Sequence, residues 1–192
     1  KIKYYIKLIL INLLIFLNNY NFYPNKYISI RNTKNYYYEN NLSYDIYNNE
    51  KIINNQLLTA EHIVPKSYLK LYKEAKRDMH NIFLTNAETN IYRSNYPYSD
   101  KITYKKLEKN KLYKYYHPCN FSKGQIARTI AYMKIIYPKI NLENIIDQEL
   151  ILEWNFMFQP SILEIKRNVL IYSLQGNINP FIEDPMIIYK FL

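Results

Sequence analysis

The candidate general bases of this 192-residue sequence are its three histidines, His62, His80 and His117. His62 directly follows Glu61 in the run TAEHIVPKS at residues 59–67. An imidazole beside a carboxylate supplies a base and an oxygen ligand, the two groups that a metal-assisted hydrolase needs. The pair therefore predicts an active site, and the alternative is that each histidine is a hydrogen-bonded residue of the core.

The residue types also restrict the metals that such a site can hold. A zinc site formed by Glu61, His62 and His80 stays open, although neither the HExxH spacing nor a pair of cysteines occurs. The single cysteine, Cys119, excludes an intramolecular disulfide and a cysteine-based zinc site within these residues.

The composition reflects codon usage as well as function. The formal net charge of +10 is typical of proteins that bind nucleic acid or an anionic membrane. However, Asn, Lys, Ile and Tyr, whose codons are rich in A and T, make up about half of the chain. Because such a bias raises the lysine content by itself, the functional prediction rests on the His, Glu, Arg, Gly, Pro and Trp residues.

The first 20 residues differ from the rest. A cationic stretch at residues 1–7 precedes an apolar run at residues 8–17, which is the pattern of a secretory signal. The run is shorter than the roughly 20 residues of a membrane-spanning helix, and no small-x-small cleavage site follows. We expect residues 1–20 to be a signal or anchor with membrane contact through residues 2–17, or else a buried helix. Residues 21–42 predict an irregular lead-in, and residues 43–192 form the main domain.

Helices are the best-marked elements of the main domain. Three capping boxes, in which Ser or Thr is followed three residues later by Glu or Gln, predict helix starts. They lie at Thr85, Ser122 and Ser161. The three helices are expected to end before Pro97, before Pro138 and at Gly176. A fourth helix is predicted over residues 141–158.

Apolar periodicity assigns the faces that these helices bury. In the second helix the predicted core residues are Ile126, Ile130 and Met133. In the third they are Ile162, Ile165, Val169 and Tyr172. Short alternating runs at residues 43–47 and 56–60 predict strands, and Trp154 is expected in the core. Few strands and several helices indicate a helix-rich α+β fold.

Several motifs follow one another along the chain. They are EHIVPKS at 61–67, DMHN at 78–81, NIYRSN at 90–95, KGQIAR at 123–128, Trp154, PSILE at 160–164, RN at 167–168 and QGNINPF at 175–181. In this order they resemble the endonuclease I family of ββα-metal nucleases, also called His-Me finger nucleases. The resemblance covers about residues 43–185 and rests on the order of the motifs rather than on any one of them.

The resemblance implies a ββα-metal core with additional packed helices and a metal-dependent endonuclease that cleaves DNA, RNA or both with little sequence specificity. It makes His62 the general base and gives Glu61 and Asn90 one Mg²⁺ to hold, with Mn²⁺ or Ca²⁺ as alternatives. Mg²⁺ prefers oxygen ligands and keeps several waters, so one carboxylate and one amide suffice. Because neighbours in a strand point to opposite faces, Glu61 and His62 can share a site only where the strand ends or bulges.

Six further motif residues are candidates for supporting roles. They are Asp78, His80, Arg93, Asn95, Lys123 and Arg128. The first four either orient the metal ligands or brace the neighbouring helix. Lys123 lies in the first turn of a predicted helix, where it could meet a phosphate. Arg128 is either a phosphate contact or, as we favour, a buried ion-pair partner.

A departure from the family pattern supports a rival interpretation. The interval between His62 and the DMHN motif, residues 63–77, is short, and no motif assigns one of its residues to the scissile phosphate. The rival is a nuclease fold retained as a non-catalytic structural subunit of a large organellar or membrane assembly. Secretion or membrane routing is the expected localisation, with a mitochondrial location as the alternative.

Overall fold

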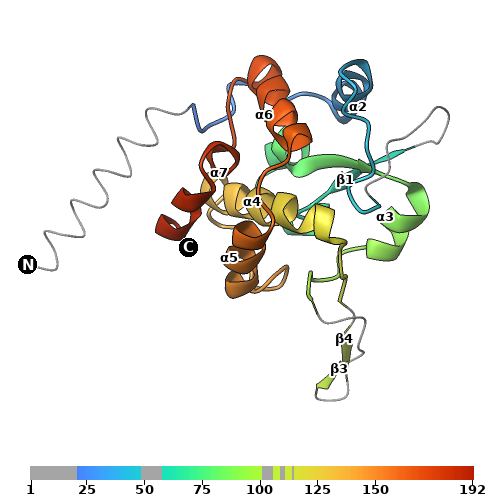
Figure 1. Ribbon diagram of the computed structural model, residues 1–192. Coiled ribbons are helices and arrows are strands. Elements are labelled where there is room, and N and C mark those ends of the chain that lie inside the picture. Colours follow the sequence, from blue (N-terminus) through green and yellow to red (C-terminus); the bar gives the residue numbers. More distant parts are fainter. Residues whose placement is uncertain (1–20, 49–57, 101–105, 109–110, 114) are drawn as a thin grey trace, which may run out of the picture.

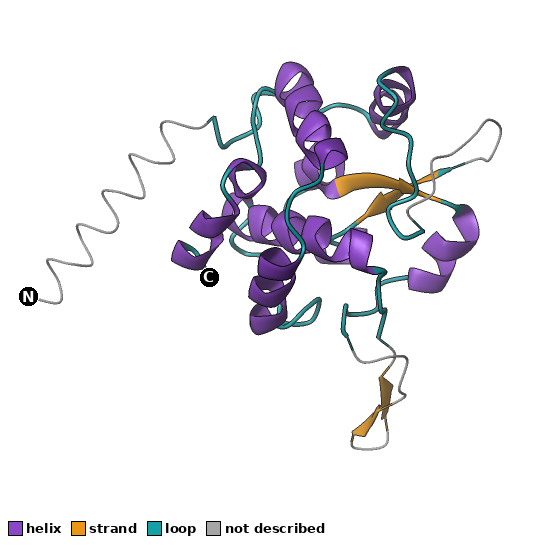
Figure 2. Ribbon diagram, viewed as in Figure 1, coloured by secondary structure: helices purple, strands orange, loops and turns teal. Residues whose placement is uncertain are grey.

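The computed structural model describes residues 21–192 except for 49–57, 101–105, 109–110 and 114. It has a helix-rich α+β fold, in which a small antiparallel sheet lies beside a group of packed helices (Figure 1 and Figure 2). The predicted signal or anchor at residues 1–20 lies outside the described residues. Of the helices that are described, none is long and apolar enough to span a membrane.

Strands β1 (Thr59–His62) and β2 (Ile82–Thr85) form an antiparallel pair, and helix α3 (Ala87–Arg93) directly follows β2. Glu61 lies opposite Phe83, and His62 lies opposite Ile82. Glu61 and His62 are both buried, although they are neighbours in a strand. Since β1 ends at His62, the two side chains meet the condition for sharing one site.

Helix α3 begins after Asn86 and not at the predicted cap, Thr85. The Asn86 side chain accepts a hydrogen bond of 2.7 Å from the N–H of Thr89. Thr85 belongs to β2, and its hydroxyl donates to Asp45 at 2.8 Å. The prediction was wrong because the Thr85 hydroxyl has a tertiary partner, which leaves the cap to the next polar residue.

The connection between β1 and β2 contains the 3₁₀ turns η1 (Lys66–Tyr68), η2 (Glu74–Arg77) and η3 (Met79–Asn81). Asn81 closes this connection at its base. Its side chain accepts from the N–H of Val64 at 2.8 Å and donates to the Val64 carbonyl at 3.0 Å. The two ends of the connection are thereby held together directly after β1.

Helix α4 (Asn120–Ile136) is the centre of the helical part (Figure 1). It contacts α5 (Gln148–Met157), α7 (Pro180–Glu183), η3 and η4 (Pro185–Lys190). The predicted core residues Ile126, Ile130 and Met133 are buried, and so is Trp154 of α5. The predicted cap Ser122 lies inside the helix, because its hydroxyl donates to the carbonyl of Ile46 instead.

Helix α6 (Ile162–Gln175) has the predicted ends but buries the opposite face. Ser161 caps its first turn, and Gly176 ends it in the left-handed region with a φ of 88°. The buried residues are mostly polar, namely Glu164, Arg167, Asn168, Ile171 and Gln175. The residues that were predicted to be buried are exposed, namely Ile162, Ile165, Val169 and Tyr172. The prediction was wrong because the polar residues have buried partners, which periodicity does not reveal.

Arg167 illustrates this arrangement. Its Nη2 atom donates to the carbonyls of Met79 at 2.6 Å, His80 at 3.0 Å and Ile82 at 2.9 Å. Its guanidinium carbon lies 3.6 Å from the ring centre of Phe83. These acceptors and the aromatic face offset the cost of burying the charge. The side chain thereby attaches α6 to η3 and β2.

Residues 21–42 were predicted to be an irregular lead-in, but they contain helix α2 (Ile30–Glu39). Ser29 caps this helix, and Thr33 and Tyr37, one turn apart, form its buried side. The Tyr37 hydroxyl lies 3.1 Å from the Met79 carbonyl. Helix α2 was missed from the sequence because the composition of this segment, rich in Asn and Tyr, resembles that of a linker.

Two other predicted elements are shorter in the structure. Within the predicted strand at residues 43–47, a parallel bridge joins Asp45 to Leu84. The helix predicted over residues 141–158 is α5, which begins only at Gln148.

The second predicted strand also differs in its bounds, and the structure contains a strand pair that was not predicted. The strand predicted at 56–60 corresponds to β1, which begins at Thr59, while residues 56 and 57 lie outside the described part. Strands β3 (Lys106–Glu108) and β4 (Lys111–Tyr113) form a second antiparallel pair, for which no element was predicted from the sequence.

Gly124 allows α4 to approach the end of α5 closely. A Cβ atom here would lie 2.1 Å from the Phe158 carbonyl oxygen and 2.7 Å from Nη2 of Arg128. We expect Gly124→Ala to lower the free energy of unfolding by about 1–3 kcal/mol, the usual cost of overpacking, although alanine is the better helix former. Urea unfolding measures this change.

The control for this prediction is Ser173→Ala, at an exposed position of α6. We expect it to change the stability by no more than about 0.5 kcal/mol. A Gly124→Ala protein as stable as the wild type would contradict the close approach of the two helices.

Candidate active site

Glu61 is held by two side chains that both contact its Oε1 atom. The Tyr47 hydroxyl donates to Oε1 at 2.7 Å, and Nε of Arg93 lies 3.4 Å from the same atom. Burial raises the pKa of Glu61, whereas the charge of Arg93 and the hydrogen bond from Tyr47 oppose this rise. Both side-chain partners thus engage Oε1, and a hydrogen bond from the His62 backbone also lowers the pKa of this carboxyl.

Tyr47 and Arg93 are themselves fixed by neighbours. The Tyr47 hydroxyl lies 2.8 Å from the Tyr98 hydroxyl, and the Arg93 guanidinium carbon lies 4.5 Å from the Tyr98 ring centre. Arg93 also donates to the carbonyls of Ile63 at 2.9 Å and Ser94 at 2.8 Å. The carboxylate of Glu61 therefore lies in a buried and oriented polar cluster.

His62 uses one ring nitrogen for a backbone contact. Its Nε2 atom lies 2.9 Å from the carbonyl oxygen of Lys76. Since a carbonyl oxygen only accepts hydrogen bonds, Nε2 carries the proton and Nδ1 has the lone pair. Burial lowers the pKa of His62 to about 4, so the ring is neutral near pH 7. A neutral imidazole with an available Nδ1 is a general base.

Asn90 of α3 is oriented toward β1. Its Nδ2 atom donates to Thr59 Oγ1 at 2.8 Å and lies 3.3 Å from the carbonyl of Ala60, the residue before Glu61. Among the described residues no hydrogen bond engages Asn90 Oδ1, so the amide oxygen is available. Asn90 thus attaches α3 to the first two residues of β1, the strand whose last two residues are Glu61 and His62.

The oxygen donors of this site suit a hard cation. A carboxylate and an amide oxygen are ligands of Mg²⁺, Mn²⁺ or Ca²⁺, and a neutral imidazole remains for proton transfer. The zinc site suggested by the residue types is not formed, because the His80 Nε2 atom instead lies 3.2 Å from the Asn177 carbonyl. Within the described part of the chain, no group of three His, Cys, Asp or Glu residues could hold a metal.

Asp45 positions this site, although the sequence pattern did not identify it. One carboxylate oxygen accepts from the N–H of Tyr47 at 2.9 Å and from the Thr85 hydroxyl at 2.8 Å. The other accepts from the N–H of Asn86 at 3.0 Å. Asp45 therefore connects the residue that contacts Glu61 with the start of α3. Its local signal is an Asx turn, in which aspartate binds the N–H two residues later.

Asp78 and His80 belong to the core. The Asp78 carboxylate accepts from the hydroxyls of Tyr132 at 2.9 Å and Tyr137 at 2.8 Å, and from the Gln175 amide at 2.9 Å. Burial lowers the pKa of His80 to about 3. These contacts connect η3 with α4 and α6, which fits the bracing role among the two interpretations.

Arg93 and Asn95 differ in their burial and in their contacts with the predicted ligands. Arg93 is buried beside Glu61, as described above, whereas Asn95 is exposed beyond the end of α3. The two residues were predicted together from one motif, and the structure brings only Arg93 against a predicted ligand.

Lys123 and Arg128 each form an ion pair, and only the pair of Arg128 is buried on both sides. The Lys123 Nζ atom lies 2.7 Å from Asp100, which also accepts from the Trp154 indole at 2.8 Å. Arg128 binds Glu164 through two contacts of 2.7 Å. Lys123 does not lie free at the start of α4, and the preferred interpretation of Arg128 as an ion-pair partner agrees with the structure.

Lys66 supplies an exposed positive charge next to the Glu61–His62 pair. Besides burial, which is the largest influence on both groups, its charge lowers the pKa of Glu61 and of His62. Arg93 also acts on both side chains, but it is buried and uses its guanidinium to bind backbone carbonyls. Lys66, at the start of η1, is accessible to a ligand.

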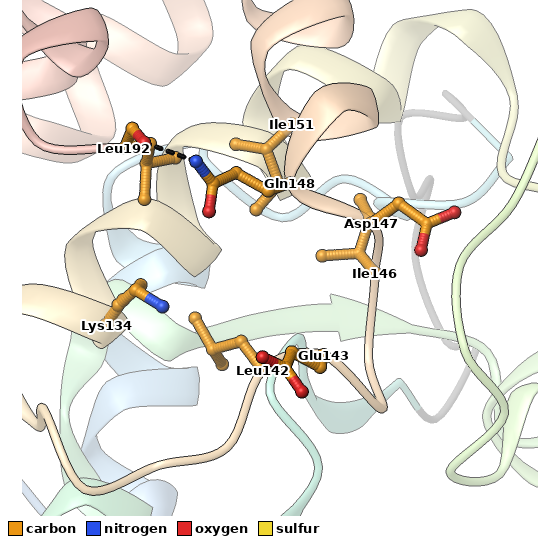
Figure 3. A pocket seen from close by; sticks show the side chains of 8 residues that line it. All are labelled: Lys134, Leu142, Glu143, Ile146, Asp147, Gln148, Ile151 and Leu192. Atoms are coloured by element: carbon orange, nitrogen blue, oxygen red, sulfur yellow. Dashed lines mark hydrogen bonds between the residues drawn. The ribbon is translucent and has the colours of Figure 1, made fainter.

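A cavity of about 120 Å³ lies between α4 and α5, away from these residues (Figure 3). Its lining includes Lys134, Glu143 and Gln148, and the Gln148 amide donates to the Leu192 carbonyl. None of the predicted site residues lines this cavity.

Known proteins give an independent comparison. Residues 18–186 match the family model of Endonuclease I. An extracellular deoxyribonuclease of Aeromonas hydrophila is 33% identical over 126 residues, which cover 58% of this chain and 52% of that protein. A periplasmic deoxyribonuclease of the same organism is 35% identical over 120 residues, or 58% of this chain and 49% of that protein.

Endonuclease-1 of Buchnera aphidicola subsp. Baizongia pistaciae is 31% identical over 123 residues, which cover 58% of this chain and 48% of that protein. The chain spans about half the length of the curated relatives that it matches. The family model covers most of the chain, and it confirms the resemblance that the order of the motifs indicated. The protein belongs to the Endonuclease I family.

Proposed function

We propose that the protein is a metal-dependent endonuclease that hydrolyses phosphodiester bonds in nucleic acid. The observation that carries this proposal is the hydrogen bond between His62 Nε2 and the Lys76 carbonyl, which leaves Nδ1 as a base. The base lies beside a buried carboxylate at the end of β1, and Asn90 of α3, which contacts Thr59 and Ala60 of the same strand, would add an amide oxygen. In this proposal β1, β2 and α3 form the ββα-metal core.

In the proposed mechanism, Glu61 and Asn90 would hold one Mg²⁺ through their side-chain oxygens. A bound Mg²⁺ would stabilise the negative charge that develops on the phosphate and on the leaving oxygen. Tyr47 and Arg93 orient the Glu61 carboxylate by occupying Oε1. His62 Nδ1 would accept a proton from the attacking water, while the Lys76 carbonyl fixes the tautomer of the ring.

The proposed substrate is DNA, with RNA as a second substrate to be tested. Two of the relatives above are deoxyribonucleases by name. The net charge of +10 suits recognition through the phosphate backbone, which gives little sequence specificity. We expect binding to weaken steeply with salt for the same reason.

We also propose secretion, because those two relatives are named extracellular and periplasmic. The rival interpretation, a non-catalytic subunit of a large organellar or membrane assembly, has no support from these relatives. The arrangement of Glu61, His62 and Asn90 favours the enzyme over the structural role, since an inactive scaffold needs no oriented base.

The direct test is digestion of plasmid DNA and of RNA with Mg²⁺, with EDTA and with a Glu61→Gln variant. We expect EDTA to abolish cleavage. Because losing even a partner of a metal ligand costs about 10–100-fold, we expect Glu61→Gln to lower the rate by about 100-fold or more. Glu143→Gln, which lines the cavity of Figure 3, is the matched control. Cleavage that persists in EDTA would contradict metal dependence.

Lys66 is proposed to contact the scissile phosphate, the role to which no motif assigns a residue. We expect Lys66→Ala to lower kcat/KM about tenfold, less than the roughly 100-fold effect of a buried donor. Lys70→Ala removes an equal charge from a nearby exposed residue and should have little effect at the same ionic strength. Equal losses in both variants would show that only the overall charge matters.

A further inference from the structure

Helix α6 presents an apolar stripe to the surface. The exposed fractions are 73% for Ile162, 44% for Ile165, 60% for Val169 and 53% for Tyr172. These residues recur at three- and four-residue spacing, so they line one side of the helix. The opposite side is the polar buried face of α6. A row of exposed apolar residues on one helix is typical of a docking surface.

The first described residues are attached to the C-terminal end of this helix. Asn21 donates through its side chain to the Gly176 carbonyl, and the N–H of Ile178 donates to the Asn21 carbonyl at 3.1 Å. The N–H of Asn25 donates to the Gln175 carbonyl at 3.0 Å. Phe22, between them, is buried. The chain therefore enters the described structure a few residues beyond Tyr172, where the stripe ends.

The chain before this point contains a segment of matching chemistry and length. Nine of the ten residues at positions 8–17 are apolar, and only residues 18–20 separate this run from Asn21. The stripe, from Ile162 to Tyr172, extends about 15 Å along the helix. A ten-residue run spans about 15 Å as a helix and about 33 Å when extended, so it reaches along the stripe in either form.

We propose that the apolar run at residues 8–17 packs on the stripe of α6 within the same chain. This packing would remove the apolar surfaces of the run and of the stripe from water, which is favourable. Because the linker is short, the run is present at a high effective concentration, which favours this contact over one with a second copy. In a chain that has lost these residues, the stripe becomes accessible to other partners.

Disulfide trapping in the full chain tests this proposal. In a Cys119→Ser background, Leu14→Cys is combined with Val169→Cys on the stripe or with Ser173→Cys beside it. With oxidised glutathione as the oxidant, we expect an intrachain disulfide to form at least tenfold faster with Val169→Cys. Adding Ile165→Glu to that pair should remove most of this difference, since a carboxylate interrupts the apolar contact.

Two measurements identify the occupant. Mixing isotope-labelled and unlabelled chains distinguishes intrachain from interchain disulfides by mass spectrometry, and flotation with phosphatidylglycerol vesicles detects membrane binding. A disulfide between chains would assign the stripe to a second copy. Flotation that suppresses the disulfide would assign the run to a membrane. Either result, or equal rates for the two cysteine pairs, would overturn the proposal without affecting the nuclease assay.

Discussion

The His62→Ala variant is expected to cleave plasmid DNA about 10²–10⁴-fold more slowly than the wild type, because a positioned general base contributes about that much. The structure provides the reason, since the Lys76 carbonyl takes the Nε2 proton and leaves Nδ1 as the only basic ring nitrogen. Initial cleavage rates at saturating Mg²⁺ measure the loss. Added imidazole should restore part of the rate, which a variant with a merely damaged fold would not show.

The matched control is His117→Ala, at an exposed histidine whose Nδ1 atom lies 3.1 Å from the Ser99 carbonyl. We expect its rate to stay within about twofold of the wild type, as for a surface substitution away from the chemistry. Thermal unfolding of both variants checks that the folds are intact. If His62→Ala were as active as His117→Ala, the assignment of the base would be wrong.

The Arg128→Met variant is expected to lose about 3–5 kcal/mol of unfolding free energy, the usual cost of removing one partner of a buried ion pair. Arg128 contacts both carboxylate oxygens of Glu164 at 2.7 Å, and each side chain is almost fully buried. Its Nη1 atom also donates to the carbonyl of Phe158 at 2.9 Å. Guanidinium chloride unfolding measures the loss through the midpoint and the slope.

The double variant Arg128→Met with Glu164→Leu separates the isolated charge from the lost packing. Because replacing both partners of a buried ion pair by apolar residues is often close to neutral, we expect it to be more stable than Arg128→Met alone. If the effects of the two single substitutions simply added, the ion pair would not be coupled in the way that the contacts indicate.

In helix α6, local signals predicted the two ends of the helix but not its buried face. Ser161 and Gly176 determine where α6 begins and ends through their own backbone contacts, so their residue types suffice. Which face of α6 is buried depends on Arg128 and on the carbonyls that Arg167 binds. These partners are distant in sequence, and for this reason apolar periodicity gave the wrong face.

The same distinction applies to the candidate site. The order of motifs pointed to Glu61, His62 and Asn90, and the structure packs α3, which carries Asn90, against β1, which carries the other two; their roles stay a prediction. Asp45 was missed because its partners, among them Thr85 and Asn86, lie about 40 residues later in the sequence. A single sequence shows no relation between such residues.

The hydrogen bond from His62 to the Lys76 carbonyl makes the orientation of the ring depend on the length of the loop between these two residues. The acceptor is a backbone atom, so no substitution of the Lys76 side chain removes it directly. Inserting or deleting residues between Pro65 and Lys76 would displace the carbonyl and free the ring to exchange its tautomer. In evolution, such changes in loop length could alter or abolish the proposed nuclease activity while every reactive side chain stayed in place.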